Sequence, residues 1–324
     1  MAEKNENSSL KVVAIGGGAG MHTLLSGLKD RPCDLVAIIT VADDGGSSGR
    51  LRKDFDIPPP GDIRNCLVAM SEGEPELARL FQYRFEASFL SGHSFGNLFI
   101  AALTKLNGDF RGAVEHARKL LNVRGSVLPA TESKVTIVAE HPDGSKSTGQ
   151  VIVAETPKPI VSIKLVPKPP SISDEIKSVL ADADLICVGP GRIYTEVMPT
   201  LLVPGMVEAI NESTAHKLFV ANLMTQPGQT EGFTLSDHVE SLRKLEKGLC
   251  LDMILCAADR VGDQLLKRYA EAGSVPVVPV KGQMNGIRVH LAELIETGPK
   301  VRHSPQRLAK AVFDSYDLLL NPSD

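Results

Sequence analysis

The sequence predicts an α/β protein with a Rossmann-like, three-layer α/β/α fold and a mostly parallel sheet. Short apolar runs rich in Val and Ile alternate with helical patterns along most of the 324 residues. Glycine-containing polar loops follow the apolar runs, and an apolar content of 43% supplies an ample core. Strands that alternate with helices form parallel sheets covered on both faces, because each crossover helix packs against the sheet.

The first unit of this sheet is expected between residues 11 and 50. KVVAI is predicted to be a strand, MHTLLSGLKD a helix and LVAIIT a second buried strand, with VADDGGSSGR as the loop that follows. Further helices are predicted at 62–71, 75–85, 98–106 and 111–121, the first with Asp62 as its N-cap.

Between residues 125 and 170 the pattern changes to alternating β-structure. SKVTIVAE and TGQVIVAE are predicted to pair around a Pro-Asp-Gly turn. We expect a small β-hairpin excursion between two α/β halves, either structural or part of an oligomer contact. Residues 11–324 are expected to form a single domain and residues 1–10 a disordered tail.

The second half returns to strands and helices. The expected strands are DLICVG, HKLFVANL, MILCAAD and VPVVPV, the last at 275–280. The expected helices are 197–210, 235–246, 262–272 and 304–320, the last beginning with Ser304-Pro305.

Charge and cysteine content narrow the function classes. The net charge is −4 and no basic run stands out, so nucleic acid is not expected as a partner. No apolar stretch is long enough to span a bilayer, and no signal peptide is visible. The five cysteines include no C-x-x-C pair and are expected to be reduced, buried thiols of a cytoplasmic protein.

Ligand binding is expected first at the glycine loop after the first strand, formed by Gly16, Gly17, Gly18, Ala19 and Gly20. Glycines allow close approach to the backbone, and N–H groups at a helix start can face a phosphate. The loop departs from G-x-G-x-x-G, because Ala19 and Met21 occupy the places where the last glycine would fall. The alternative is a tight turn without a ligand.

The loop after the second strand combines carboxylates, hydroxyls, glycines and a cation. Its members are Asp43, Asp44, Gly45, Gly46, Ser47, Ser48 and Arg50. Asp43 and Asp44 are candidates to hold Mg²⁺, because that ion takes one or two carboxylates together with phosphate oxygens. Exposed amides and Arg50 suit the phosphates themselves. The alternative is a solvated turn.

Other polar residues after strands each have a structural alternative. Arg192, in the Gly189-Pro190-Gly191-Arg192 loop, could meet a phosphate or be solvated, and Asn222 could bond a base or sugar or its own loop. Asp44 and His93 are the candidate catalytic residues, although a lone His is more often structural. Asn97 could instead cap its helix, and Arg302-His303 could be a surface pair. His22 stands at the start of the first helix, where a cation is disfavoured, and could be a neutral ring near a phosphate.

Several long loops, taken in order, resemble those of the CofD/YvcK family. They are AIGGGAG, TVADDGGSSGRLR, PPPGDIRNCL, SGHSFGNLFIAAL, VGPGRIYTEVMPTLLVPG and ANLMTQPGQTEGF, and the match runs from about residue 11 to 320. The resemblance implies a Rossmann-like fold and one of two activities. One branch is 2-phospho-L-lactate transferase, which moves a phospholactyl group from a guanosine diphospho-lactate donor to a deazaflavin with Mg²⁺. The other is the YvcK branch, called gluconeogenesis factor, which binds UDP-sugars and is tied to cell shape and wall synthesis.

The sequence is more similar to the YvcK branch, on the forms PPGDIRN and GHSFGN. These motifs add Asp62 and Asn65 to the ligand-binding candidates, and the resemblance implies that Tyr269 and Arg302 bind the UDP-sugar. Ser304 stands where the family continues with an acidic residue and threonine, so a phosphorylation there would fall on Ser304. An aromatic content of 4% without tryptophan fits poorly with a deazaflavin stacking site.

We therefore expect a cytoplasmic regulatory protein that binds a nucleoside diphosphate-linked ligand, foremost a UDP-sugar such as UDP-N-acetylglucosamine. Mg²⁺ is the expected cofactor, with no group bound covalently. A homodimer and contacts with cell-wall synthesis proteins are the expected assemblies. The alternative is a Mg²⁺-dependent transferase of the 2-phospho-L-lactate type in the same crevice. A third hypothesis, an NAD-linked reductase, is weakened by the interrupted glycine fingerprint.

Overall fold

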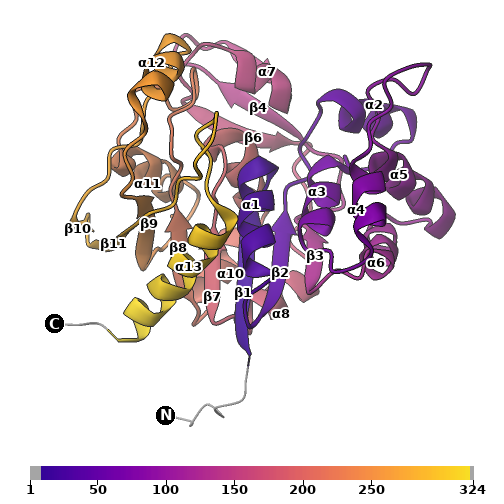
Figure 1. Ribbon diagram of the computed structural model, residues 1–324. Coiled ribbons are helices and arrows are strands. Elements are labelled where there is room, and N and C mark those ends of the chain that lie inside the picture. The colour runs from indigo at the N-terminus through magenta and orange to yellow at the C-terminus, as the bar shows by residue number, and fades with distance from the viewer. Residues whose placement is uncertain (1–8, 322–324) are drawn as a thin grey trace.

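The computed structural model describes residues 9–321 and confirms the predicted α/β/α architecture. An eight-stranded sheet has the order β10-β11-β9-β8-β7-β1-β2-β3, and only the β10–β11 pair is antiparallel (Figure 1). Its strands are β1 (Leu10–Gly16), β2 (Cys33–Ile39), β3 (Ser126–Pro129), β7 (Leu185–Val188), β8 (His216–Val220), β9 (Met253–Ala257), β10 (Gly282–Met284) and β11 (Ile287–Ala292).

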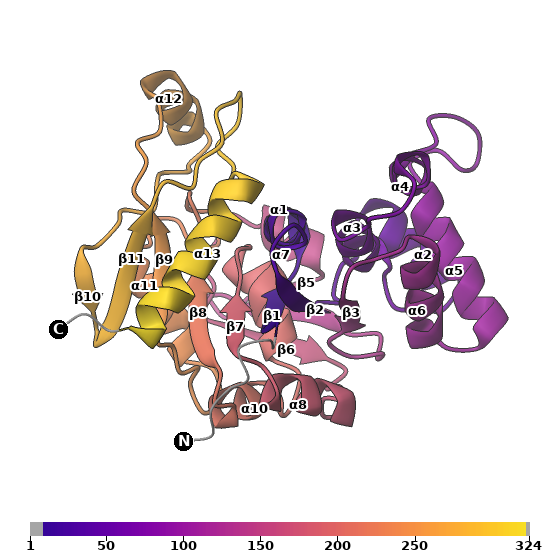
Figure 2. The same cartoon turned by 60° about the horizontal axis from the view of Figure 1, so that its bottom comes forward.

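Helices cover both faces of this sheet. One face carries α1 (Gly18–Leu28), α3 (Gly61–Ala69) and α13 (Pro305–Leu320). The opposite face carries α8 (Asp174–Ala181), α10 (Met206–Glu212) and α11 (Leu235–Arg243), as Figures 1 and 2 show together. Because both faces are covered, the central strand β1 is a continuous apolar run without alternation, and residues 12–15 are at most 2% exposed.

The chain reverses its direction of progress across the sheet between β1 and β7. From β1 it proceeds to β2 and β3 on one side, and from β7 to β8 and β9 on the other. Ala14 pairs with Ala37 of β2 and with Cys187 of β7, so these three strands run parallel and in close register. Open α/β sheets bind ligands at such a switch point, outside the carboxyl ends of the strands.

A group of helices lies beyond β3, at the edge of the sheet (Figure 2). Its members are α2 (Gly46–Asp54), α4 (Pro75–Gln82), α5 (Phe95–Asn107) and α6 (Phe110–Leu120). Ser94 caps α5 by accepting from the Asn97 N–H, and Asp109 caps α6 by accepting from the Gly112 N–H. Asn97 is thus inside its helix and does not cap it. Residues 46–50, predicted to be a loop, form the first turn of α2.

The small β-structure is a separate three-stranded antiparallel sheet of order β5-β4-β6. It consists of β4 (Thr136–Glu140), β5 (Lys146–Thr148) and β6 (Ser162–Val166), while β3 belongs to the large sheet. The expected second hairpin strand ends at Thr148, because VIVAE folds as helix α7 (Gln150–Glu155). The two Asp44 carboxylate oxygens accept the N–H groups of Gln150 and Val151 and so cap α7.

The second half departs from prediction in two further elements. The helix predicted at 197–210 is interrupted: a π-helix, η1 (Ile193–Val197), leads into α9 (Met198–Leu201), and α10 starts only at Met206. Pro204 and Gly205, which has φ of +85°, lie at this break. Residues 275–280 form no strand beyond an isolated bridge between Met224 and Pro276, since prolines cannot donate to a ladder.

The remaining expectations about the chain have mixed outcomes. Helix α12 (Asp263–Glu271) agrees with its prediction within a residue. Four cysteines are buried as expected, whereas Cys250 is exposed. Residues 1–8 of the predicted tail lie outside the described residues, and Leu10 already belongs to β1. Within residues 9–321, no helix is both long and apolar enough to cross a bilayer.

Candidate functional site

A crevice of about 540 Å³ opens at the switch point of the sheet. Its lining comes from five separate parts of the chain that meet near the carboxyl ends of β1, β7 and β8. Sequence-predicted residues in the lining are Ala19, Gly20, His22, Gly191, Arg192, Asn222, Tyr269, Arg302 and His303. The fold therefore joins the first glycine loop to the loops of the second half, which the sequence alone could only predict to lie at the same sheet edge.

The start of helix α1 forms one wall of the crevice. Gly17 is the N-cap of α1, and Ala19 and Gly20 in the first turn face the cavity. The first N–H groups of a helix have no partner within the helix and carry partial positive charge. The Gly18 N–H already donates to the Asp62 carboxylate, so the anion-binding capacity that remains belongs to the next residues of the turn.

The opposite wall is built by α12 and the segment before α13. The Tyr269 hydroxyl accepts the Val301 N–H at 3.1 Å and thereby ties this segment to α12. Arg302, the next residue, is exposed at the rim, while His303 is buried and lines the crevice. Burial lowers the pKa of His303 to about 4, so its imidazole is neutral at physiological pH.

Asn222 and Glu196 form the floor between these walls. The Asn222 side-chain oxygen accepts the Gly191 N–H at 3.2 Å, and its Nδ2 is buried without a partner. Glu196, from η1, accepts the Arg192 N–H at 2.9 Å. Its side chain is 14% exposed, and burial, as the largest cause, raises its pKa.

Asp43 and Asp62 form an acidic group behind the crevice, beside the glycine loop. Asp62 is in the first turn of α3 but does not cap it, because the N-cap position is Pro60. Burial, followed by the charges of Asp43 and Glu196, raises the pKa of Asp62 to about 8. Burial also raises the pKa of Asp43, whose carboxylate accepts from the Gly45 N–H and the Ser48 hydroxyl.

The chemistry of this acidic group favours a cation beside it. Arg64 is the buried cation nearby, and burial lowers its pKa to about 10 while Asp62 and Asp43 oppose that shift. Within residues 9–321, no three His, Cys, Asp or Glu side chains are arranged to hold a metal ion by themselves. A Mg²⁺ site here would therefore use one or two carboxylates together with ligand oxygens, as that ion commonly does.

The Asp44 carboxylate is engaged with the backbone of α7 and does not line the crevice. Both of its oxygens accept backbone N–H groups at 3.0 Å from the start of α7. Asp44 therefore joins the small sheet to the loop after β2 and leaves Asp43 as the functional candidate of the pair. Arg50 also points elsewhere: it is exposed and donates to the Ser91 carbonyl at 2.7 Å.

The remaining predicted residues around α2 form a buried hydrogen-bond network outside the crevice lining. The Asn97 amide donates to Ser47 Oγ at 3.1 Å, and Ser47 lies 3.1 Å from the His93 Nδ1 atom. Because Ser47 accepts from Asn97, its hydroxyl can donate to a neutral His93, whose pKa is lowered by burial and then by Arg50. Asn65 is half-buried on α3. Packing of α2 against α5 and the 91–94 loop accounts for this network without catalysis.

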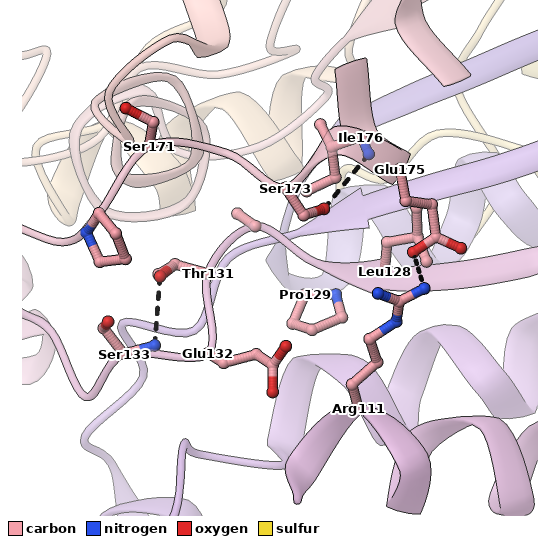
Figure 3. A pocket seen from close by; sticks show the side chains of 12 residues that line it. Arg111, Leu128, Pro129, Thr131, Glu132, Ser133, Ser171, Ser173, Glu175 and Ile176 are labelled. Atoms are coloured by element: carbon pink, nitrogen blue, oxygen red, sulfur yellow. Dashed lines mark hydrogen bonds and ion pairs between the residues drawn. The ribbon is translucent and has the colours of Figure 1, made fainter. Parts of the chain in front are cut away.

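A smaller hollow of about 200 Å³ lies between the end of β3, α6 and the start of α8. Figure 3 shows Arg111 turned toward Glu175, with which it forms an ion pair, and Ser173 bonded to the Ile176 N–H. None of the sequence-predicted site residues lines it. Arg111 and Glu175 are thus engaged with each other, and the switch-point crevice is the candidate functional site.

Glu196 lines the crevice but is not among the sequence-predicted site residues. Glu196 is an isolated acid in the otherwise uncharged run IYTEVMPTLL, which is a signal for a buried carboxylate. His303, a candidate that the sequence leaves open as part of a surface pair with Arg302, is buried, and its burial depends on packing between residues distant in sequence. Here the ring donates to the Ala221 carbonyl of the β8 strand end.

Fold and site together define a class: a doubly wound α/β protein with a polar, ligand-sized crevice at its switch point. The family model described as 2-phospho-L-lactate transferase CofD matches residues 12–295. The chain is 44% identical over 268 residues to the gluconeogenesis factor of Bacillus subtilis, covering 82% of this chain and 84% of that one. It is 43% identical over 307 residues to the gluconeogenesis factor of Halalkalibacterium halodurans, with 94% and 95% covered.

A solved structure agrees with these relatives. The crystal structure of a protein from Bacillus halodurans superposes with a TM-score of 0.91 at 42% identity, covering 94% of this chain and 99% of that one. The chain belongs to the CofD family, and its curated relatives carry the name gluconeogenesis factor.

Proposed function

We propose that the switch-point crevice binds a nucleoside diphosphate-linked ligand and that this ligand is a UDP-sugar such as UDP-N-acetylglucosamine. The observation that carries the proposal is the convergence of a helix N-terminus, two arginines and a tyrosine on one cavity of about 540 Å³. A helix start and arginines suit a diphosphate, and an aromatic ring suits a base or a sugar face. Binding pockets for small molecules have volumes in this range.

Each group has a role in this proposal. The N–H groups of Ala19 and Gly20, with Arg192 and Arg302, hold the diphosphate. The ring of Tyr269 packs against the base or the sugar, and its hydroxyl keeps Arg302 in place through Val301. The unpartnered Asn222 amide is a donor for a ligand oxygen, which would remove the cost of leaving it unbonded.

The biological role we propose is regulatory: a cytoplasmic gluconeogenesis factor that senses a UDP-sugar and acts on cell shape and cell-wall synthesis. The names of the relatives support the first part of this role. Contacts with cell-wall synthesis proteins, a homodimer and modification of Ser304 belong to the same proposal. Ser304 is the half-buried N-cap residue of α13, directly after His303, so a phosphate there would add charge beside the crevice.

Mg²⁺ fits this site if Asp62 replaces Asp44 in the predicted pair of ligands, Asp43 and Asp44. Asp44 is engaged at α7, whereas Asp43 and Asp62 are half-buried acids whose pKa values are raised. A divalent cation would relieve the repulsion between them, so these two residues are the proposed ligands. When bound, Mg²⁺ would supply positive charge to the diphosphate oxygens.

Isothermal titration calorimetry tests the proposal. The protein is titrated with UDP-N-acetylglucosamine, GDP and NAD, each with Mg²⁺ and with EDTA. The expected result is preferential binding of UDP-N-acetylglucosamine, strengthened by Mg²⁺ and lost in Arg302→Ala. Glu231→Gln, an exposed change in the 222–232 loop, serves as the control and should bind like the unmodified protein. Preference for NAD, or equal heats for all three ligands, would contradict the proposal.

A transferase of the 2-phospho-L-lactate type remains the second candidate, and the half-buried Asp43–Asp62 group favours it. A cation beside a departing nucleotide phosphate would stabilise the charge that develops there. For an enzyme, Asp62→Asn should abolish turnover of a guanosine diphospho-lactate donor while retaining much of the affinity. For a sensor, the unmodified protein has no such turnover, and Asp62→Asn changes only the Mg²⁺ dependence of binding.

A further inference from the structure

Glu196 places a carboxylate in the floor of the crevice, where the proposed ligand carries its diphosphate. The residue belongs to η1 (Ile193–Val197), a π-helix that follows the Gly189–Arg192 loop directly. Short π-helical turns are rare and occur frequently at functional sites. A negative side chain at this position opposes an anionic ligand, so its presence needs an explanation.

The Glu196 carboxylate uses donors that a phosphate would also use. One oxygen accepts the Arg192 N–H at 2.9 Å, and the other lies 3.9 Å from the Arg192 guanidinium Nε. Arg192 is otherwise exposed, with 47% of its side chain accessible. The backbone N–H of Arg192 is therefore taken by a carboxylate of its own chain, which also lies within ion-pair distance of the guanidinium.

Two glycines provide the room for this carboxylate. Gly18 has φ of +69°, and a Cβ atom added there would overlap the Glu196 carboxyl group. A Cβ atom added to Gly191 would lie 3.1 Å from the Glu196 Oε2 atom. The space above the glycine loop, which the sequence predicts to receive a ligand phosphate, is thus filled from within the protein.

The charges around Glu196 do not favour it there. Arg192 is its cationic partner, but the negative charge of Asp43 raises the pKa of Glu196. The charge of Glu196 in turn raises the pKa of Asp62. A carboxylate that is partly buried and near other acids is held less firmly than a fully paired one. Its exchange for a ligand phosphate is correspondingly less costly.

We propose that Glu196 is an internal competitor for the anionic group of the ligand. In the free protein its carboxylate occupies the Arg192 backbone N–H and the space above Gly18, and a diphosphate must displace it in order to bind. This inference rests on the proposed function for the identity of the ligand. It adds that the crevice binds diphosphates less tightly than its two arginines alone would allow.

The test is Glu196→Gln, which keeps an oxygen to accept the Arg192 N–H and removes the charge. Affinities for inorganic pyrophosphate and for UDP-N-acetylglucosamine are measured by calorimetry in EDTA. We expect Glu196→Gln to bind both at least about tenfold more tightly than the unmodified protein, which corresponds to ~1.4 kcal/mol. Glu208→Gln is the matched control, because Glu208 on α10 pairs with Lys247 and the variant loses the same charge outside the crevice. It should leave both affinities unchanged.

The outcomes separate this inference from the proposed function. If Glu196→Gln binds pyrophosphate more tightly but neither protein binds UDP-N-acetylglucosamine, the role of Glu196 as a competitor is supported and the proposed identity of the ligand is contradicted. Binding of UDP-N-acetylglucosamine that is equal or weaker in Glu196→Gln overturns the competitor, because Glu196 would then be neutral toward the ligand or bond it directly. Glu196→Ala serves the same comparison if the amide variant folds poorly, and thermal unfolding of every variant identifies such a failure.

Discussion

Replacing His303 with Asn should reduce the sensitivity of the protein to acid. The imidazole is buried in the crevice wall, where it donates to the Ala221 carbonyl, and its Nε2 atom has no partner. The donating atom is therefore Nδ1, and an Asn side chain can place its amide N–H near the same position. His303→Asn thus keeps the anchoring hydrogen bond and removes only the titratable ring.

The expected magnitude follows from the pKa of His303, which burial lowers from 6.5 to about 4. Above pH 6.5 the ring is neutral in both the folded and the unfolded chain, and it has no effect on the pH dependence of stability. As the pH falls from about 6.5 to about 4, the unfolded chain takes up a proton that the folded protein excludes, and stability is lost. At ~1.4 kcal/mol for each pKa unit, the total loss is about 3 kcal/mol.

Urea unfolding between pH 7.5 and pH 4 measures this effect. At neutral pH the variant should be somewhat less stable than the unmodified protein, because the ring also packs. The free-energy difference between the two should then shift in favour of His303→Asn by up to about 3 kcal/mol as the pH falls. His116→Asn, at an exposed position on α6, is the control and should follow the unmodified protein. Parallel curves for His303→Asn and the unmodified protein would refute the reasoning.

Three further predictions concern the acids and the tyrosine of the site. Burial raises the pKa of Asp62 from 3.8 to about 8, so its stabilising contribution is complete below pH 3.8 and is lost as the pH rises through 8. Asp62→Asn should therefore be more stable than the unmodified protein at pH 9 in urea with EDTA, by up to about 6 kcal/mol. Asp44→Ala removes the cap of α7 and should lower the free energy of unfolding by about 1–2 kcal/mol. Calorimetry should show that the Mg²⁺ dependence of ligand binding is unchanged in this variant. Tyr269→Phe leaves the Val301 N–H without its partner, so UDP-N-acetylglucosamine should bind about tenfold more weakly.

Strands β1, β2, β7, β8 and β9 of the large sheet could be predicted because each is mostly buried and reads as a largely apolar run. Elements could not be predicted where the local sequence favours one structure and contacts with distant residues impose another. Residues 151–154 are apolar and three of them are β-branched, yet they form part of α7 because Asp44, more than a hundred residues earlier, supplies its cap. Ile287–Ala292 was missed although it alternates apolar and polar residues, the pattern of a half-buried strand.

The site could be predicted to the level of loops but not of individual side chains. Polar loops after parallel strands meet at one edge of the sheet, so the glycine loop, the Arg192 loop and Asn222 were expected together and lie together. Which carboxylate of Asp43-Asp44 faces the glycine loop depends on whether a neighbour takes the other. That neighbour, the start of α7, belongs to a segment for which the sequence indicates a strand.

Asp62 and Glu196 both lie in stretches of mostly buried residues, and this feature indicates a site more clearly than the motifs around them do. Asp62 is followed by residues that are buried with one exception up to Leu67, and Glu196 stands among buried apolar neighbours of η1. An ionised carboxylate is costly in such a place unless a partner of opposite charge compensates for it. Arg192 can compensate for Glu196 only in part, because its guanidinium is largely exposed, and Arg64 faces two acids at once. The acids are therefore poised for a further positive charge or for displacement, whereas Asp44, with two backbone donors, needs neither.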